Sequence, residues 1–408
     1  MGKVRKLLLR KFKKFFIIFI GWSLLFPIVS FIKRFFPKKY IIFIGRDSSV
    51  FLDNCKYLYL YMVKNYKNLN PIFLTEDKDT FISLRRNNLP VIFYPSIEAT
   101  KVILQSKILI VDNLMWIKNF KHFLFLDTFK IQLWHGAGFK YIEKMNKKDK
   151  EVNSLKGFLT GRRQKYDVVV STSPFYTKYV FSKSFDFNEI WETGYPRNDV
   201  FFRNIDKYDL INVDISILDN IQRKKQKGFK IMLYAPTFRD TGGDPFQDKA
   251  INLTELNSFL KKQNIFLLMK FHPDPNFDYK KFDNLSNITI YPNEKDIYPI
   301  MKFVDVLITD YSSIYMDFIL MDKPVIFFPY DYSKYITKDR QIQFDYNWIT
   351  PGPKAYKFDE LIQTIENILE NDRYKKQREN IRNIAWKFVD GNASYRIVKN
   401  ITAVLNKI

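Results

Sequence analysis

The sequence predicts an α/β protein with two Rossmann-like domains that face each other across a cleft. Short runs rich in β-branched and aromatic residues alternate with longer amphipathic stretches from Tyr40 onward. The alternation stops in a charged connection at residues 204–227 and then resumes. The length of 408 residues also exceeds that of one ordinary domain. Two parallel, doubly wound sheets account for all three observations.

Composition narrows the range of functions. The hydrophobic content of 46% is enough for large cores, so the chain is not disordered. A single cysteine, Cys55, excludes a disulfide framework and, with only three histidines present, argues against a zinc site. The formal net charge of +23 indicates a polyanionic partner, which could be a nucleic acid, an anionic membrane or a phosphate-rich substrate.

Residues 1–39 are expected to associate with a membrane. Basic clusters flank an uncharged run at residues 15–32, which has about the minimum length for a transmembrane helix. Gly21 and Pro27 interrupt the run, and equally basic flanks give no orientation by the positive-inside rule. A cleaved signal peptide fits poorly because no small-residue cleavage site follows. An amphipathic anchor on an anionic leaflet and a single span are both open, and a buried helical hairpin is the alternative.

The N-terminal domain is predicted to cover residues 40–205. Its strands are expected at residues 40–45, 71–74, 91–94, 108–111, 130–133, 167–171 and 190–193. Helical patterns lie between several of them, at residues 55–67, 79–87 and 97–106. This order is typical of a parallel sheet.

The C-terminal domain is predicted to cover residues 206–375. Its strands are expected at residues 229–234, 265–271, 288–291, 306–309 and 325–328, with helices at 253–263, 296–303 and 314–321. The tail from residue 358 has a continuous helical pattern. We expect residues 376–408 to pack back on the N-terminal domain.

Two histidines lie at strand ends, one in each predicted domain. His135 follows the strand at 130–133, and the glycines after it allow a close approach of backbone or substrate. His272 follows the strand at 265–271, and Pro273 stops that strand. Each alone would more often be structural, but two histidines facing one cleft favour catalysis. His122 lies in no motif and is interpreted as structural.

The turn after the strand at 306–309 is a predicted anion site. Ser312 and Ser313 precede a helix, where free backbone N–H groups favour a phosphate, although the same residues could serve only as helix caps. Arg197 and Arg239 follow turns that contain proline. Arginine suits bidentate phosphate contact, whereas a solvated surface role is the alternative for both.

The motifs and their order along the chain resemble those of the CDP-glycerol glycerophosphotransferase family, the teichoic-acid primases and polymerases. The resemblance rests on residues 132–140, 194–199, 234–239, 272–273, 309–318, 323–324 and 351–353. One departure is Ala-Gly-Phe at residues 137–139, where Thr-Pro-Leu is expected; it could alter the acceptor or the polyol of the donor. Members of this family adopt the GT-B fold, in agreement with the two predicted domains.

The resemblance implies a membrane-associated transferase that moves glycerol phosphate from CDP-glycerol to a hydroxyl of a lipid-linked acceptor and releases CMP. It implies that His135 is the base and that His272 contacts or protonates the diphosphate. The donor would be bound by Arg239, Thr309, Ser312, Ser313 and Asp317. The acceptor or the cleft wall would involve Gly136, Lys140 and Arg197.

The same resemblance implies no tightly bound cofactor and no protein-held metal, although Mg²⁺ could accompany the nucleotide. It places the enzyme at the cytoplasmic face of the bacterial cell membrane, as a monomer or a homo-oligomer. A ribitol-phosphate transferase or a glycosyltransferase using a nucleotide sugar would use the same cleft. Single addition and polymerisation are both open. A nucleic-acid-binding protein would leave the apolar N-terminus and the paired histidines unexplained.

Overall fold

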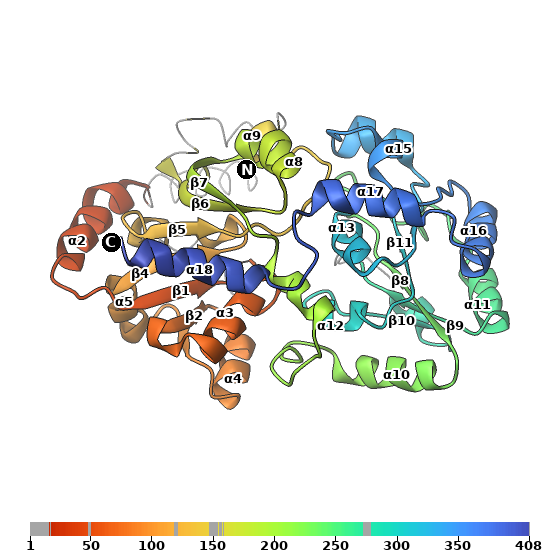
Figure 1. Cartoon of the computed structure of the whole chain (residues 1–408), viewed down its shortest axis with the longest axis horizontal. Helices are drawn as coiled ribbons and strands as arrows, with labels where there is room; N and C mark the ends of the chain where they lie inside the picture. The colour runs from red at the N-terminus through yellow and green to blue at the C-terminus, as the bar shows by residue number, and fades with distance from the viewer. Residues whose placement is uncertain are drawn as a thin grey trace, which may run out of the picture.

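The computed structural model describes residues 16, 18–47, 50–117, 121–146, 154, 157, 159–271 and 279–407. It contains two parallel sheets that lie side by side (Figure 1). The first has seven strands in the order β3-β2-β1-β4-β5-β6-β7, and the second has five in the order β10-β9-β8-β11-β12. The prediction of two parallel, doubly wound sheets is therefore confirmed.

The N-terminal sheet forms because most of the predicted runs are apolar and are buried in the core, whereas the edge strand at residues 186–192 is mostly polar and partly exposed. Its strands are β1 (Tyr40–Ile44), β2 (Pro71–Thr75), β3 (Val91–Phe93), β4 (Ser106–Val111), β5 (Phe129–Gln132), β6 (Lys165–Ser171) and β7 (Asp186–Glu192). The helices that matter for the site are α3 (Asp53–Asn65), α4 (Lys78–Arg86), α5 (Ile97–Leu104), α6 (Lys121–Leu124), α8 (Pro174–Tyr176) and α9 (Ser182–Ser184). All seven predicted strands are present, with ends shifted by up to four residues.

The C-terminal sheet contains β8 (Lys230–Tyr234), β9 (Ile265–Met269), β10 (Ile288–Ile290), β11 (Val306–Thr309) and β12 (Val325–Phe327). Its helices include α10 (Ile215–Gln226), α11 (Leu253–Lys262), α12 (Tyr298–Met301), α13 (Ile314–Phe318), α14 (Tyr332–Lys334) and α15 (Tyr346–Ile349). The predicted helices at residues 296–303 and 314–321 are shorter than expected. The second continues beyond α13 only as a 3₁₀ turn, Ile319–Met321.

The expected continuous helical tail is wrong. It is divided into α16 (Phe358–Glu370), α17 (Lys375–Ala385) and α18 (Ala393–Leu405). Gly391 adopts φ +68° between the last two helices, a conformation that favours glycine. The helix α18 lies against α3 of the N-terminal domain (Figure 1). Both carboxylate oxygens of Asp199 accept backbone N–H groups at its start, from Ala393 and Ser394 at 2.9 Å.

The described part of the N-terminal segment is helical. A π-helical turn, Gly21–Leu25, leads into α2 (Phe26–Lys33), which packs against α6. Lys33, from the basic cluster after the apolar run, is buried and donates to Asp127 at 2.7 Å. Among the described residues, no helix is long and apolar enough to cross a membrane.

Candidate active site

A cleft of about 400 Å³ lies between the carboxyl ends of the two sheets. Both domains line it, as expected for parallel sheets whose strand ends face each other. The N-terminal domain contributes Arg46, Trp134, His135, Gly136, Gly138 and Lys140. The C-terminal domain contributes Thr237, Lys270, Asn293, Ser312 and Ser313.

The strand β5 directs His135 into this cleft through an unusual turn. Trp134 has φ +59°, in the left-handed region that a bulky residue rarely adopts. Its N–H donates to the Gln132 side chain at 2.9 Å, and its carbonyl accepts from Asn54 Nδ2 at 2.7 Å. These two hydrogen bonds fix the turn and therefore the direction of the imidazole.

The surroundings of His135 keep its imidazole neutral and fix its tautomer. Nδ1 lies 3.1 Å from the Asp112 carbonyl, which can only accept, so Nδ1 carries the proton. Nε2 is then the unprotonated nitrogen. Burial lowers the pKa of His135 to about 4, with Asp53 opposing the shift. The side chain is therefore a ready proton acceptor at neutral pH.

This depressed pKa predicts the pH profile of the free enzyme. An ordinary histidine base protonates near pH 6.5, and kcat/KM would then fall as the pH drops below that value. Because the pKa of His135 is lowered to about 4, we expect no fall in kcat/KM between pH 7.5 and 5.5. Initial rates of transfer across this interval provide the measurement. An acidic limb centred near pH 6.5 would contradict the neutral-imidazole assignment.

The glycines after His135 allow it to approach the predicted anion-binding turn. A Cβ atom on Gly136 would lie 2.7 Å from Ser313 Oγ, and one on Gly138 would lie 3.2 Å from Ser313 Cβ. A side chain at Gly136 would force the Ser313 hydroxyl to move away. The segment that carries His135 therefore lies directly against the serine turn in the cleft.

Helix capping does not account for the two serines. Ser313 occupies the N-cap position of α13 but makes no capping hydrogen bond. Ser312 Oγ lies 3.5 Å from the Ile314 N–H, the limit of a hydrogen bond. Because α13 has only five residues, its dipole adds little here. The hydroxyls and backbone N–H groups of the turn are thus available to a ligand.

Arg197 connects the two domains beneath His135. Its Nη1 donates to Asp53 Oδ1 at 2.6 Å and to the His135 carbonyl at 2.8 Å. Its Nη2 donates to Asp317 Oδ2 at 2.7 Å, across the domain boundary. Only 2% of Arg197 is exposed, so it acts as a buried bridge rather than as a solvated arginine.

Asp317 has different partners from those expected from the sequence. Besides Arg197, its carboxylate accepts from Asn198 Nδ2 at 2.8 Å and from the Tyr298 hydroxyl at 2.9 Å. Both oxygens are engaged and the residue is 1% exposed. Asp317 lines the cleft and holds Arg197 in place, and its contact with a ligand hydroxyl stays a prediction.

Arg239 is also placed differently from the expectation. It is buried behind the cleft wall, with Nε and Nη2 bound to the Asp331 carboxylate at 2.7 and 2.8 Å. Its Nη1 lies 2.8 Å from Asp310 Oδ2. Thr309 is buried as well, and its hydroxyl donates to the Ala235 carbonyl at 2.7 Å. These contacts give Arg239 and Thr309 supporting positions next to the serine turn, and their direct contact with the donor stays a prediction.

The remaining predicted residues divide between the cleft and the undescribed part of the chain. Lys140 lines the cleft, and its backbone pairs with Ile342 of the other domain. Burial, and then the charge of Arg340, lower the pKa of Lys140 to about 7. His272 lies outside the described residues, so its role stays a prediction.

Sequence reasoning missed several polar residues of the cleft, Asn293 and Arg340 among them. Arg46, Asp53 and Lys270 all line it. Arg46 follows β1 by two residues and Lys270 follows β9 directly, so the same strand-end criterion that found His135 would have found both. Asp53 begins α3 with φ +65° and had no comparable signal in the sequence.

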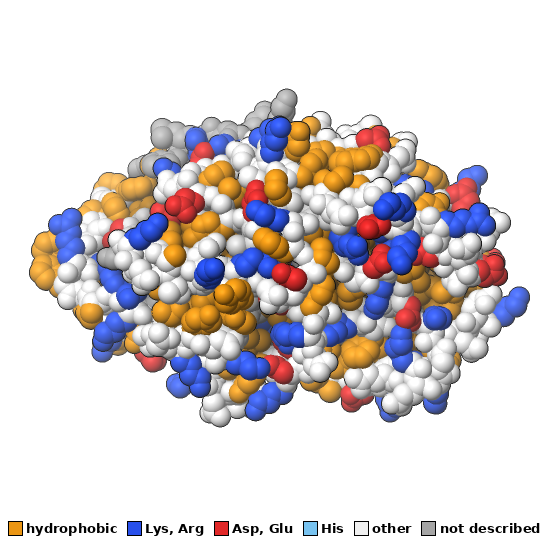
Figure 2. Space-filling view, viewed as in Figure 1, with side chains coloured by type: hydrophobic (Ala, Val, Ile, Leu, Met, Phe, Trp, Pro, Cys, Tyr) orange, Lys and Arg blue, Asp and Glu red, His pale blue; other side chains and the backbone are white. Residues whose placement is uncertain are grey.

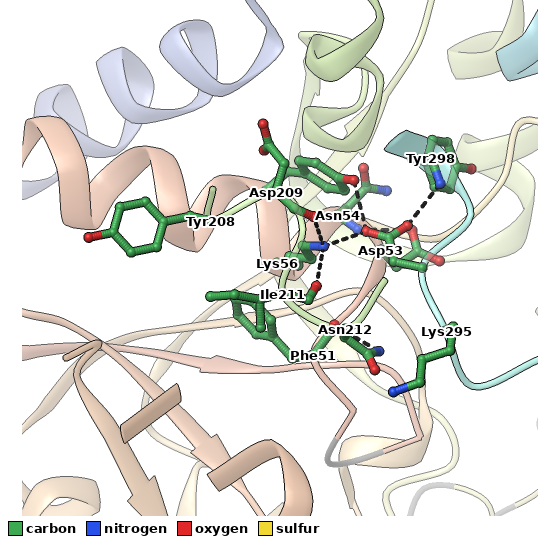
Figure 3. Close-up of polar contacts among 12 residues, drawn as sticks. Phe51, Asp53, Asn54, Lys56, Tyr208, Asp209, Ile211, Asn212, Lys295 and Tyr298 are labelled. Carbon is green, nitrogen blue, oxygen red and sulfur yellow. Dashed lines mark hydrogen bonds and ion pairs between the residues drawn. The ribbon is translucent and has the colours of Figure 1, made fainter. Parts of the chain in front are cut away.

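A second buried ion pair, made by Lys56, joins the domains (Figure 3). Lys56 Nζ points at the carbonyls of Asp209 and Ile211 in the interdomain connection, each at 2.7 Å. It also donates to Asp296 Oδ2 at 2.7 Å, and the Tyr57 hydroxyl donates to the same oxygen at 2.8 Å. The first turn of α3 therefore fixes the C-terminal domain relative to the N-terminal sheet.

Replacing Lys56 with methionine is expected to lower the free energy of unfolding by about 3–5 kcal/mol, because Asp296 is left buried without its counter-charge. The matched control is Lys64→Met on the same helix. Lys64 is 68% exposed and its ion pair with Asp206 spans 3.5 Å, so less than about 1 kcal/mol should be lost. Thermal and urea unfolding of both variants provide the measurement. Equal losses would refute the interdomain role of Lys56.

Within the described ranges, no group of three or more histidine, cysteine, aspartate or glutamate side chains could hold a metal ion.

Comparison with known proteins identifies the family. The model of the CDP-glycerol:poly(glycerophosphate) glycerophosphotransferase family matches residues 26–403. The chain belongs to this family. The teichoic acid poly(glycerol phosphate) polymerase of Bacillus subtilis (strain 168) is a relative that is 28% identical over 351 residues. The teichoic acid poly(ribitol-phosphate) polymerase of Bacillus spizizenii is 32% identical over 243 residues.

This glycerophosphotransferase-family chain matches only part of those two relatives. The aligned regions cover 82% and 57% of this chain, but 44% and 37% of the relatives. Among solved structures, a histidine variant of the wall teichoic acid polymerase TagF superposes with a TM-score of 0.73 at 22% identity, and the match covers 98% of each chain. That likeness establishes a TagF-like GT-B fold for this member of the family.

Proposed function

We propose that this chain transfers a polyol phosphate, most simply glycerol phosphate from CDP-glycerol, to a hydroxyl of a lipid-linked acceptor. The observation that carries the proposal is the opposition of two groups across the cleft. Neutral His135, with Nε2 unprotonated, faces the Ser312–Ser313 turn, which offers hydroxyls and backbone N–H groups for a diphosphate. A base opposite an anion site is the arrangement that phosphoryl transfer to a hydroxyl requires.

In the proposed reaction, Nε2 of His135 accepts the proton of the acceptor hydroxyl. The hydroxyl oxygen attacks the phosphorus that carries glycerol, and the bond from this phosphorus to the bridging oxygen breaks. CMP leaves with the bridging oxygen and its negative charge. The Ser312–Ser313 turn and the nearby Lys140 ammonium stabilise the charge on the phosphates. A Mg²⁺ ion would enter, if at all, with the nucleotide.

The names of the relatives support this class of donor. One is a glycerol-phosphate polymerase and the other a ribitol-phosphate polymerase. A TagF variant that is 22% identical to this chain was also solved after soaking with CDPG. Glycerol phosphate is our first choice because the family model bears its name and the glycerol-phosphate relative aligns over more of this chain. Ribitol phosphate is the second choice, supported by the 32% identity of the relative that bears its name.

Competition between donors tests the proposal. Purified full-length protein is incubated with a lipid-linked acceptor and radiolabelled CDP-glycerol, CDP-ribitol or UDP-sugars. We expect label from CDP-glycerol to enter the lipid fraction and CMP to be released in equal amount. If only CDP-ribitol is a donor, the proposed polyol changes from glycerol to ribitol, but the proposed type of reaction is unchanged. Transfer from UDP-sugars alone would refute the proposal.

We also propose that the N-terminal segment holds the enzyme on an anionic membrane, at the cytoplasmic leaflet where nucleotide donors are made available. The outward side of the segment carries Phe19, Leu24, Ile28, Phe31 and Phe35, each 51–72% exposed. Hydrophobic side chains gather at this end of the molecule (Figure 2, left edge). An apolar helix face beside basic residues is typical of an interfacial helix.

Replacing Ile28 and Phe31 together with serine is expected to weaken binding to anionic lipid vesicles by about tenfold, because exposed apolar area that would enter the lipid is lost. Ile215→Ser on α10 is the matched control, since Ile215 is 45% exposed but lies in the other domain. Co-sedimentation with vesicles measures both. Unchanged binding of the double variant would contradict the proposed membrane contact.

A further inference from the structure

Three cations of the cleft have no close carboxylate partner in the described part of the chain. They are Arg46, Lys140 and Lys270. The nearest approach is that of Arg46 Nε to the Asp47 carboxylate at 3.9 Å, and both of these side chains are exposed. The other arginines of the lining already form ion pairs with aspartates. The uncompensated charges are therefore concentrated on these three residues.

Arg46 lies at the reacting end of the cleft. It follows β1, and its carbonyl accepts the Val50 N–H at 3.0 Å, which closes a short loop around it. Arg46 lines the same cleft as His135, and about 40% of its side chain is exposed.

Lys270 approaches from the other domain. Its Nζ donates to the carbonyls of Pro292 and Asn293 at 3.0 Å and of Lys295 at 3.3 Å. The three carbonyls hold the ammonium in place without neutralising it. Burial lowers the pKa of Lys270 to about 7, and the next contribution is the charge of Arg46. Lys270 and Arg46 thus line the same cleft from opposite domains.

We propose that Arg46 and Lys270 form a phosphate subsite shared by the two domains and separate from the Ser312–Ser313 turn. Both cations line one cleft, one from each domain, so an anion bound between the domains is stabilised by both charges. Arg46 supplies the hydrogen bonds to the phosphate, because its guanidinium has only the distant, exposed Asp47 as an ionic partner. Lys270 supplies charge from a fixed position, since its donors already bind carbonyls.

The phosphate in this subsite has two possible sources, and their identity rests on the proposed function. One is the diphosphate of the donor, whose second phosphate would extend beyond the serine turn. The other is a phosphodiester of an acceptor that already carries a polyol-phosphate unit. In either case, residues from both domains bind one anion.

Titration with pyrophosphate tests the subsite without relying on transfer. Isothermal titration calorimetry compares wild type with Arg46→Gln, Lys270→Gln and the control Arg86→Gln, an exposed arginine on α4. We expect Arg46→Gln to weaken pyrophosphate binding by about tenfold or more, as for a lost charge-assisted hydrogen bond. Lys270→Gln should weaken it less, and Arg86→Gln should bind as wild type does. Wild-type affinity in Arg46→Gln would overturn the proposal.

Steady-state kinetics then distinguishes the two sources. Arg46→Gln is assayed with CDP-glycerol and two lipid-linked acceptors, one with and one without a terminal glycerol phosphate. A donor KM raised about tenfold with both acceptors assigns the subsite to the donor diphosphate. A raised KM only for the phosphate-bearing acceptor assigns it to the acceptor. If the wild-type chain transfers nothing from CDP-glycerol, the proposed function fails, while the pyrophosphate titration still decides the subsite.

Discussion

Replacing His135 with asparagine is expected to lower kcat by about 10²- to 10⁴-fold, the range associated with loss of a positioned general base. Asparagine can still donate to the Asp112 carbonyl, so the turn after β5 should keep its shape. The proton acceptor at the position of Nε2 is lost, whereas the serine turn and the bridging arginine remain. The measurement is the transfer rate at saturating donor, together with the thermal unfolding midpoint.

The matched control is His122→Asn in the same domain. His122 is 4% exposed and its Nδ1 lies 2.7 Å from Gln164 Nε2, in a buried cluster with Trp22 and Phe123. Its replacement should lower the unfolding midpoint and leave kcat near that of wild type. A folded His135→Asn protein that transfers at close to the wild-type rate would remove His135 from the role of base.

Replacing Arg197 with methionine is expected to cost about 3–5 kcal/mol of stability and to reduce kcat, because two carboxylates remain buried without their partner. These are Asp53 in one domain and Asp317 in the other. The loss of the hydrogen bond to the His135 carbonyl also loosens the base. Adding Asp317→Asn to this variant should restore part of the stability, since one of the two orphaned charges is removed.

The single variant Asp317→Asn separates two roles for this carboxylate. If it positions Arg197, as its contacts indicate, the unfolding midpoint and kcat fall while the donor Kd stays near that of wild type. If it binds a donor hydroxyl, the donor Kd rises and the midpoint is unchanged. The second pattern would overturn the positioning role.

The fold was largely predictable because most of the strands are continuous apolar runs. Such runs are stable as strands only where both faces of the sheet are buried. Helix ends were less predictable. Residue 391 needs a left-handed backbone, and Gly391 together with Asp390 was the available signal for the break before α18. The sequence around Lys33 predicts a cation that faces the membrane. Its actual partner, Asp127, is 94 residues away in the chain, and a local sequence pattern does not reveal such a distant partner.

The residues of the candidate site were also predictable only in part. The strand-end rule located His135, Gly136 and the serine turn, the family resemblance added Lys140, and all of these line the cleft. The rule could not tell which strand-end arginines were already neutralised. Arg239 is paired with Asp331, 92 residues away, and such distant partners leave no periodic signal. A supporting arginine differs from one that faces the cleft because it and its aspartate partner are both buried. Tertiary packing decides that burial.

Mass spectrometry of the product tests the central claim most directly. Full-length protein is incubated with CDP-glycerol and a synthetic lipid-linked disaccharide, and the lipid product is compared with that of His135→Asn. We predict that the acceptor gains one or more glycerol-phosphate units, that an equal number of CMP molecules is released, and that His135→Asn forms almost none of this product. An unchanged acceptor with CDP-glycerol, alongside addition of a sugar from a nucleotide sugar, would contradict the account.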